Sequence, residues 1–305
     1  MKPRPIALAA PWLLAAAACT AAAQDAKARP GARGAAAAPP ACAVAATSVS
    51  LPRRAAESSG VAVSRRHPGV YWTHNDRGGE ALLFAVDSLG HLLGEIQVRG
   101  GEAHDWEDIA RGPCPAGECL YVADTGNNRE KRDEVALYRV AEPSPDAREA
   151  RAESFPMRFP GHPRDAEALF VLPSGEVYFV SKGESGPVEL FRYPLPLRPG
   201  RRVELERVRR IAPEPRRRGD KVTAADATSD GRWVAVRTYD ALSIYRTGDL
   251  LGSGGAALEF DLRPLGEAQG EGVGFGPNGE VVLTSEAGGR DRATLARLRC
   301  RLPAG

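Results

Sequence analysis

Short apolar runs separated by glycine-containing turns recur along the chain, and two stretches are close copies of each other. Residues 165–182 (DAEALFVLPSGEVYFVSK) and 270–286 (GEGVGFGPNGEVVLTSE) share one order of features. Each has an acid, a short apolar run, a Pro-Ser-Gly or Pro-Asn-Gly turn, a Glu-Val pair and a second apolar run that ends in polar residues. Because a Gly-containing turn joins two short β-rich runs, each stretch is predicted to be a β-hairpin.

Three further stretches follow the same template more loosely, and most hairpins are followed by two more strand-like runs. The looser copies are residues 58–76, 105–124 and 222–240. The additional runs are 82–87 with 92–98, 135–140 with 154–159, 188–193 with 203–211, and 241–245 with 257–262. Four strands in a unit of about 40 to 60 residues is the period of a propeller blade. The pattern predicts an all-β protein, a single β-propeller over residues 42–302.

The last unit contains only three strands before the chain ends, at residues 272–275, 281–284 and 294–302. Residues 42–51 alternate as a strand should and are predicted to supply the missing outer strand, which closes the ring and removes exposed sheet edges. This gives five blades. Six blades is the alternative, if 141–162 or 195–215 hides a degenerate unit. A β-sandwich, the main rival fold, does not explain a hairpin repeated with the same acid in the same place.

The cysteines are consistent with this closure. The chain has five, and setting aside Cys19 near the N-terminus leaves Cys42, Cys114, Cys119 and Cys300. An even number in an exported chain indicates disulfides. Cys114–Cys119 is predicted to clip a tight turn, and Cys42–Cys300 to staple the two ends of the folded part. A metal site is the alternative, but C-x4-C without a second Cys or His pair is not zinc spacing.

The N-terminal region has the order of a secretory signal. A basic start is followed by an apolar run over residues 6–18 and then by small residues, so residues 1–23 are predicted to be a signal sequence. Two interpretations remain: a lipoprotein signal with Cys19 lipidated, or an ordinary signal cut after Ala23. Residues 24–41 are rich in Ala, Pro and Gly and are predicted to be a flexible tether. We therefore expect an exported protein, a periplasmic or outer-membrane lipoprotein or a secreted protein, that contacts membrane only through an N-terminal lipid.

Charge and motifs exclude several function classes. The formal net charge is +2, which argues against nucleic acid as a partner. The arginine-rich segment 201–218 is interpreted as a solvated face, with contact to anionic lipid or polysaccharide as the alternative. No Walker loop, dinucleotide fingerprint or G-x-S-x-G elbow is present. We expect a monomer whose partner is an unknown protein or small molecule.

One face of the predicted propeller collects the unusual polar residues. The inner strand of a blade leaves this face and the second strand returns to it, so inner-strand starts and second-strand ends lie together. The turns at the opposite end are ordinary, so the other face is expected to be plain. The predicted ligand-binding face comprises His74, Asn75, Asp76, His104, Asp105, Glu107, Asp108, Asp124, Asn127, Asn128, Asp165, Glu167, Lys182, Asp240, Glu271 and Glu286.

Carboxylates around a central channel suggest two roles. Glu107, Glu167 and Glu271 occupy equivalent template positions on three blades, and as oxygen ligands they are candidates to hold a hard cation such as calcium. The alternative is that these acids accept hydrogen bonds from backbone amides of neighbouring strands. A third interpretation places a transition metal on His74, His104 and His162, each of which has an acid close by.

Several motifs of the N-terminal half carry a family resemblance: Ser59-Gly-Val, Trp72-Thr-His-Asn-Asp76, Asp105-Trp-Glu-Asp-Ile-Ala110 and Ala123-Asp-Thr-Gly-Asn-Asn128. Through them the chain resembles a group of exported bacterial β-propeller proteins of mostly unassigned function. More distantly it is similar to the SdiA-regulated and esterase-like phytase families. The resemblance implies a propeller with calcium as a candidate ion at its channel, and it transfers no catalytic residue. We expect a binding or scaffold module that acts through its acidic face; the alternative is a calcium-dependent hydrolase of phosphate esters or similar small molecules.

Overall fold

The structure, a computed structural model, describes residues 40–76 and 79–303. The predicted signal sequence, the Cys19 lipidation site and almost all of the tether lie outside these residues and stay predictions. No helix among the described residues is long and apolar enough to cross a bilayer.

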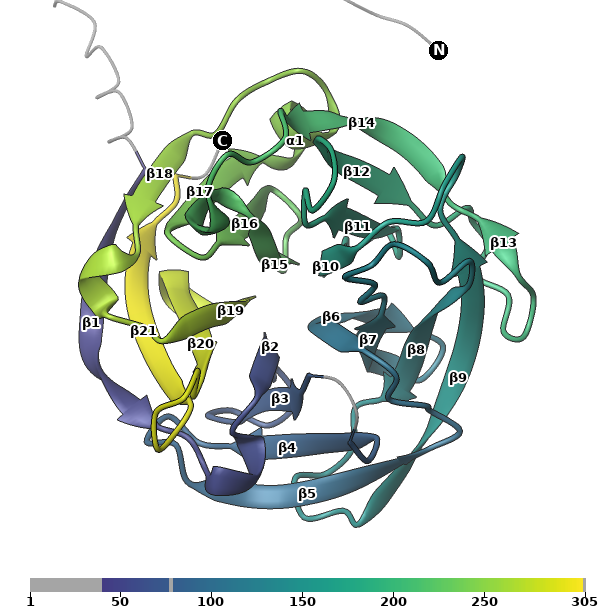
Figure 1. The fold of residues 1–305 in the computed structure, drawn as a ribbon. Helices are drawn as coiled ribbons and strands as arrows, with labels where there is room; N and C mark the ends of the chain where they lie inside the picture. The colour runs from purple at the N-terminus through teal and green to yellow at the C-terminus, as the bar shows by residue number, and fades with distance from the viewer. Residues whose placement is uncertain (1–39, 77–78, 304–305) are drawn as a thin grey trace, which may run out of the picture. The chain divides into compact units, whose positions relative to one another are not determined.

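The described residues form a ring of five four-stranded antiparallel blades, which confirms the predicted all-β propeller (Figure 1). In every blade the chain runs from the innermost strand outward, and only the outermost strand of the fifth blade comes from the other end of the chain. The first blade consists of β2 (Ser58–Val63), β3 (Tyr71–Asn75), β4 (Leu82–Val86) and β5 (Leu92–Arg99), the second of β6 (Trp106–Cys114), β7 (Gly117–Asp124), β8 (Val135–Ala141) and β9 (Glu149–Arg158), and the third of β10 (Ala166–Val171), β11 (Val177–Ser181), β12 (Val188–Arg192) and β14 (Glu206–Ala212). The fourth consists of β15 (Val222–Ala227), β16 (Trp233–Thr238), β17 (Ala241–Arg246) and β18 (Leu258–Asp261), and the fifth of β19 (Gln269–Phe275), β20 (Glu280–Glu286), β21 (Thr294–Arg301) and β1 (Ala41–Ser50).

The remaining elements are short and lie between or beside the strands. They are β13 (Val203–Glu204), the helix α1 (Thr247–Leu251) and four 3-10 turns at Arg53–Ala55, Arg218–Asp220, Arg263–Leu265 and Pro277–Gly279.

The N-terminal strand closes the ring, as predicted. β1 runs antiparallel to β21 with Cys42 opposite Cys300, and a disulfide joins the two cysteines across 258 positions of sequence. The second disulfide, Cys114–Cys119, clips the turn between β6 and β7. Strands from the two ends of the chain therefore share one blade, and no edge of the ring stays open there.

The two segments considered for a sixth blade contain outer strands instead. β9 belongs to the second blade and also pairs in parallel with β5 of the first, where Gln97 lies opposite Glu149. At its other end β9 pairs with β13, which brings Val203 opposite Met157. One long outer strand thus hydrogen-bonds to segments of both neighbouring blades.

The hydrophobic core lies between adjacent blades. The inner strands β2, β10 and β15 are buried along their whole length, so both faces of each strand pack against neighbours. Aromatic side chains such as Trp72, Trp106, Phe179 and Phe191 fill the spaces between blades and are at most 1% exposed. The polar side chains at strand ends are consequently held on a rigid frame.

Candidate functional site

A β-bulge recurs near the start of every inner strand. The register between inner and second strand shifts around Glu107 in β6, Glu167 in β10 and Thr223 in β15. Equivalent shifts include Ser59 in β2 and Glu271 in β19. A bulge leaves one residue without a cross-strand partner and re-aims its side chain. These five residues, which we call the bulge ring, therefore occupy matching places around the channel.

The bulge ring combines three carboxylates with two hydroxyls. Ser59 Oγ donates to the backbone oxygen of Glu107 at 2.6 Å, and Thr223 Oγ1 donates to that of Glu271 at 3.0 Å. The hydroxyl residues thus link neighbouring inner strands. Their hydrogen bonds use the backbone oxygens of Glu107 and Glu271 and not the carboxylates. All five side chains are buried.

Two groups of carboxylates meet at Glu107. Oxygens of Asp76, Asp105 and Glu107 all lie within 4.8 Å of one another, and so do oxygens of Glu107, Asp165 and Glu167. Both separations suit a shared cation with oxygen ligands. We call these five residues the acid cluster. Because Glu107 belongs to both groups, it is the centre of the cluster.

Gly126 allows the acid cluster to be this compact. A Cβ atom at this position would lie 1.9 Å from Glu107 Oε1 and 2.5 Å from Asp105 Cγ. The loop after β7 can therefore approach the carboxylates only because residue 126 has no side chain.

Burial and mutual repulsion shape the electrostatics of the acid cluster. Desolvation, followed by the charges of Glu167, Asp76, Asp165 and Asp105, raises the pKa of Glu107 well above its usual range. Desolvation also raises the pKa of Glu167, to about 8, against the opposing effect of Lys182. Lys182 Nζ lies 2.6 Å from Glu167 Oε1 and 3.6 Å from Asp165 Oδ2. Two acids of the cluster thus share one ammonium group, and the negative charge of the cluster exceeds what Lys182 can balance.

This arrangement predicts a fall in stability as the pH rises from 6.5 to 8 when no divalent cation is present. The folded-state pKa of Glu167, about 8, lies above its ordinary value of 4.5, so the folded protein binds more protons than the unfolded chain in this window. Buried His74 has a pKa lowered from 6.5 to about 4 by desolvation, and its opposite effect falls mainly below pH 6.5. Urea unfolding in chelator-containing buffer should show a loss of about 1–2 kcal/mol per such carboxyl.

Two variants separate the titration of Glu167 from general effects of pH. Glu167→Gln should flatten the dependence between pH 6.5 and 8, whereas Glu149→Gln, on the exposed outer strand β9, should leave it unchanged. Equal slopes in the three proteins would show that Glu167 does not titrate in this window.

Other acids of the predicted face accept backbone hydrogen bonds. Asp108 is fully buried and accepts from the amides of Ile109, Leu169 and Ala225 at 2.8–3.0 Å. Those amides belong to β6, β10 and β15, so one carboxylate links three inner strands. Asp165 likewise accepts from the amide of Asn127 at 2.6 Å. Asp108 therefore holds three inner strands together at the channel.

Asp124 organises the loop beside the acid cluster. It accepts hydrogen bonds from the amide of Asp105 at 3.0 Å and from Arg132 Nη2 at 3.0 Å, and it contacts His104 Nδ1 at 3.2 Å. Asn127 Oδ1 accepts from the amides of Lys131 and Arg132. Asp124 thus fixes the backbone of Asp105, and Asn127 orders the loop that follows β7.

The histidines of the predicted face are dispersed. His74 is buried, with Nδ1 2.9 Å from the backbone oxygen of Asn75 and its ring edge-on to Trp106. Asn75 caps the nearby turn by donating to the backbone oxygen of Arg54. His104 is 60% exposed at its side chain, and His162 lines a separate hollow at the rim. In the described part of the chain, neither close group of potential metal ligands contains a histidine.

Glu271 and Glu286 are linked to a hollow beside the acid cluster. Gln269 Nε2 donates to Glu271 Oε1 at 2.8 Å and to Glu286 Oε2 at 2.9 Å, and Gln269 Oε1 accepts from Arg218 Nη2 at 2.7 Å. The hollow has a volume of about 360 Å³, and Asp240 also lines it. Glu271 lies outside both close groups of carboxylates, although the charge of Glu167 helps to raise its pKa after desolvation.

Asn128 and Lys182 complete the set, with Lys182 Nζ 3.4 Å from Asn128 Oδ1. Sequence reasoning missed Ser59, Thr223, Gly126, Gln269 and Arg218. The first two stand at the template position of the three glutamates, so the repeat itself carried a signal for them.

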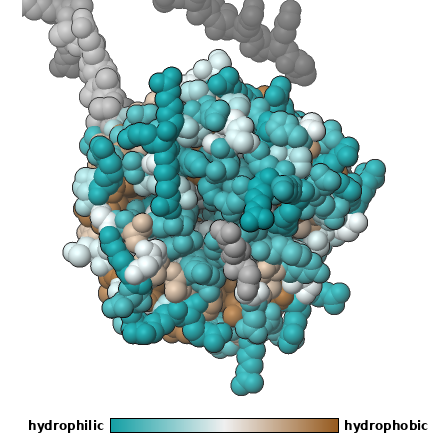
Figure 2. Space-filling view, in the orientation of Figure 1, coloured by the Kyte–Doolittle hydropathy of each residue, from teal (hydrophilic) through white to brown (hydrophobic). Residues whose placement is uncertain are grey.

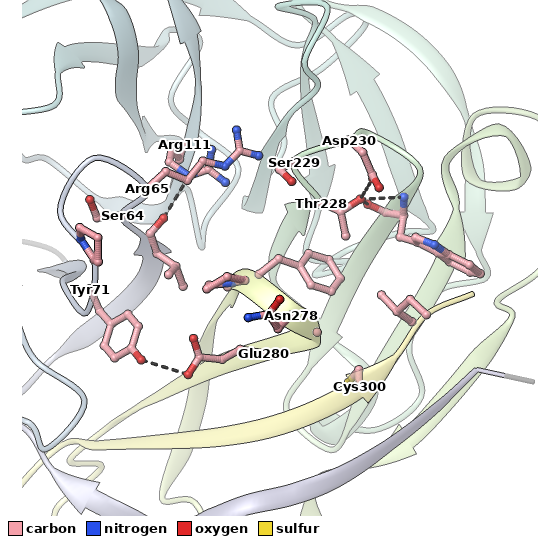
Figure 3. Close-up of a pocket in the computed structure, with 18 of the residues that line it drawn as sticks. Ser64, Arg65, Tyr71, Arg111, Thr228, Ser229, Asp230, Asn278, Glu280 and Cys300 are labelled. Atoms are coloured by element: carbon pink, nitrogen blue, oxygen red, sulfur yellow. Dashed lines mark hydrogen bonds between the residues drawn. The ribbon is translucent and has the colours of Figure 1, made fainter. Parts of the chain in front are cut away.

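The face at the opposite ends of the inner strands is not plain, which corrects the expectation from the turns. A pocket of about 680 Å³ opens there, lined by arginine, tyrosine, tryptophan and phenylalanine side chains (Figure 3). Turn residues that are ordinary one at a time form this pocket because three blades bring them together.

Comparisons with known proteins show the fold and nothing finer. No family model matches the chain, and no curated protein matches it. A solved structure of the PQQ-bound aldose sugar dehydrogenase from Streptomyces coelicolor is similar, at 14% identity over 87% of this chain and 100% of that chain, with a TM-score of 0.52. A gluconolactonase from Xanthomonas campestris (14% identity, 86% and 95% of the two chains) and a glucose dehydrogenase (12%, 85% and 100%) have TM-scores of 0.47 and 0.48. The first similarity supports a propeller-type fold, and the other two are too low to carry an argument.

Proposed function

We propose that the acid cluster binds a hard divalent cation, calcium first, and that the protein uses this cation to bind an oxyanion-bearing ligand at its acidic face. One observation carries the proposal: Glu107 is buried among four other carboxylates, all of which raise its pKa. Removing such charges from water is costly unless they are neutralised. Carboxylate oxygens at this density are typical ligands of Ca²⁺.

Within the described residues, an ion pair reaches two of the five acids of the cluster. Lys182 is the ammonium group that contacts the acid cluster, through Glu167 and Asp165. Asp165 Oδ2, a buried atom, makes no hydrogen bond within the described residues. A cation beside Glu107 would add positive charge to the cluster and could be coordinated by that oxygen.

The neighbouring hollow suggests how a ligand is held. Arg218 lies over the ring of Tyr239, 4.5 Å from its centroid, and both residues line the hollow of about 360 Å³. The pKa of Tyr239 is raised, first by desolvation and then by the charge of Glu271. A guanidinium next to a cation site fits a small anionic ligand. The face shown in Figure 2 is mainly hydrophilic, as such a ligand requires.

Binding is the primary function we propose, and a hydrolase of phosphate esters or similar small molecules is the second. The pKa of Glu167, about 8, favours the second, because a carboxyl that exchanges protons near neutral pH suits general acid–base work. Water would add to phosphorus, the alcohol would leave with a proton, and inorganic phosphate would be the other product. The distant resemblance to the esterase-like phytase family agrees with this candidate.

The compartment we propose is the cell envelope or the exterior, with the protein acting as a monomer. Two disulfides within the described residues suit an oxidising compartment. Membrane attachment is proposed only through lipid on Cys19.

The proposal is tested by adding calcium to protein stripped with chelator. Calcium should bind saturably in calorimetry and raise the melting temperature, because a ligand that binds only the folded state stabilises it. Glu107→Gln should weaken binding at least about tenfold. Glu149→Gln, matched in chemistry but on the outer strand, should leave it unchanged. If wild-type protein binds neither calcium nor magnesium, the cation proposal is wrong.

The same protein separates the two functions. Turnover of p-nitrophenyl phosphate that disappears with chelator and in Glu107→Gln would establish the hydrolase. Calcium binding without turnover would leave the binding function standing.

A further inference from the structure

The pocket on the opposite face has the features of a small-molecule site. Its volume of about 680 Å³ falls within the range of pockets that enclose ligands of drug-like size. The first, fourth and fifth blades line it at the ends of β2, β15 and β19 and the starts of their partner strands, and β6 of the second blade contributes Arg111. From Glu107 to Arg111, β6 spans about 13 Å, so this pocket and the acid cluster are separate sites.

Two adjacent arginines form one wall of the pocket, as Figure 3 shows. The Arg111 side chain is 7% exposed; its Nε donates to the backbone oxygen of Val63 at 3.0 Å, and its Nη1 lies 3.3 Å from Glu118 Oε2. Arg65 Nη1 lies 3.4 Å from the other oxygen of Glu118, and its side chain is 39% exposed. Desolvation and then the charge of Arg111 lower the pKa of Arg65. One carboxylate thus holds two guanidinium groups beside the cavity.

Among the residues that line the pocket, arginines outnumber acids. Four arginines line it (Arg65, Arg111, Arg232 and Arg301) with two acids (Asp230 and Glu280), which gives +4 − 2 = +2. Asp230 pairs with Arg232 at 2.7 Å, and Glu280 accepts from Tyr71 at 3.1 Å. Two further acids, Glu118 and Asp226, interact with Arg65 and Arg111 from outside the lining, so the excess of positive charge is confined to the pocket surface. Asp226 accepts from the amide of Phe275 at 2.7 Å and lies near both arginines.

The rest of the lining suits an apolar, flat body. Tyr71, Trp233 and Phe275 contribute aromatic surface, and each is at most 5% exposed. Arg246 lies over Trp233, 4.8 Å from the ring centroid, and holds the indole in place. Asn278 is in the left-handed conformation at φ 55°, in the turn that forms one side of the pocket, and its backbone oxygen accepts from Arg299 at 2.7 Å. The aromatic walls are therefore preformed.

We propose that this pocket binds a small organic anion, a flat apolar body with one carboxylate or phosphate group, whose charged end pairs with Arg65 and Arg111. An oxyanion matches the donor edge of a guanidinium and forms charge-assisted hydrogen bonds. The aromatic walls bury the body. This second site is independent of the cation site.

The test is calorimetric titration at fixed ionic strength with benzoate and phenyl phosphate, using neutral benzamide as the matched comparator. We expect saturable binding of at least one anion and much weaker binding of benzamide; the two anions distinguish carboxylate from phosphate. Arg65→Gln should weaken anion binding at least about tenfold. Arg66→Gln removes the same charge from the next residue, which contacts the backbone oxygen of Glu142 and does not line the pocket, and should have no effect.

Two further variants keep the interpretation clear. Ser229→Trp, at an exposed turn position of the lining, should fill the pocket and abolish binding without touching an arginine. Glu107→Gln should leave benzoate binding unchanged, so failure of the cation proposal and failure of this one are distinguishable. The proposal is overturned if neither anion binds, if benzamide binds equally well, or if Arg65→Gln and Arg66→Gln behave alike.

Discussion

Replacing Asp108 by alanine will lower the free energy of unfolding of the propeller by about 3–5 kcal/mol. The carboxylate accepts hydrogen bonds from the amides of Ile109, Leu169 and Ala225, and the residue is fully buried. Alanine would leave three buried N–H groups without an acceptor, each at a cost of about 1–3 kcal/mol. Urea or thermal unfolding measures the loss.

The geometry of the channel explains why one acid can do this. The equivalent residues of the other inner strands are Gly60, Ala168, Ala224 and Gly272, as the bulges align them. A Cβ on Gly60 would come within 2.7 Å of Asp108 Oδ1. The small residues at these four positions therefore leave room in the channel for the Asp108 carboxylate.

Two comparisons check this account of Asp108. Asp133→Ala removes an acid from an exposed loop and should change stability by less than about 0.5 kcal/mol. Asp108→Asn keeps one acceptor oxygen but turns an amide NH2 toward backbone donors, so most of the loss should remain. A loss below about 1 kcal/mol for Asp108→Ala would show that the channel satisfies these amides in another way.

Removing the Cys42–Cys300 disulfide has the other large expected effect. The bond spans 258 positions of sequence, so its loss frees almost the whole propeller in the unfolded state. Loop-closure entropy gives about 5 kcal/mol for this length. The double variant Cys42→Ala/Cys300→Ala should therefore melt about 10 °C lower.

The second disulfide is the matched control. Cys114–Cys119 spans only 5 positions, and the same relation gives about 2 kcal/mol for its removal. The double variant Cys114→Ala/Cys119→Ala should thus lose less than half as much stability. If both double variants lose the same free energy of unfolding, the length of the loop that Cys42–Cys300 closes does not determine its contribution to stability.

Most of the fold could be predicted because its signals are local. Residues 165–182 and 270–286 form the hairpins β10–β11 and β19–β20, since turn residues and alternating apolar runs specify a hairpin without distant contacts. The closing strand followed from counting strands in the last unit and from a cysteine at each end of the folded part. Pairing of β9 with β5 and β13 could not be predicted, because its partners lie in other blades.

The candidate site divides in the same way. The sequence by itself determined which face carries the acids and that Glu107, Glu167 and Glu271 are equivalent, because a repeat places equal positions at equal heights. Only the tertiary structure decided that Asp76, Asp105 and Asp165 group with Glu107 and Glu167, while Glu271 binds Gln269. It alone also placed Arg65 and Arg111 beside one pocket. The physical reason is that bulges and blade contacts set distances between side chains far apart in sequence, and no local pattern records those distances.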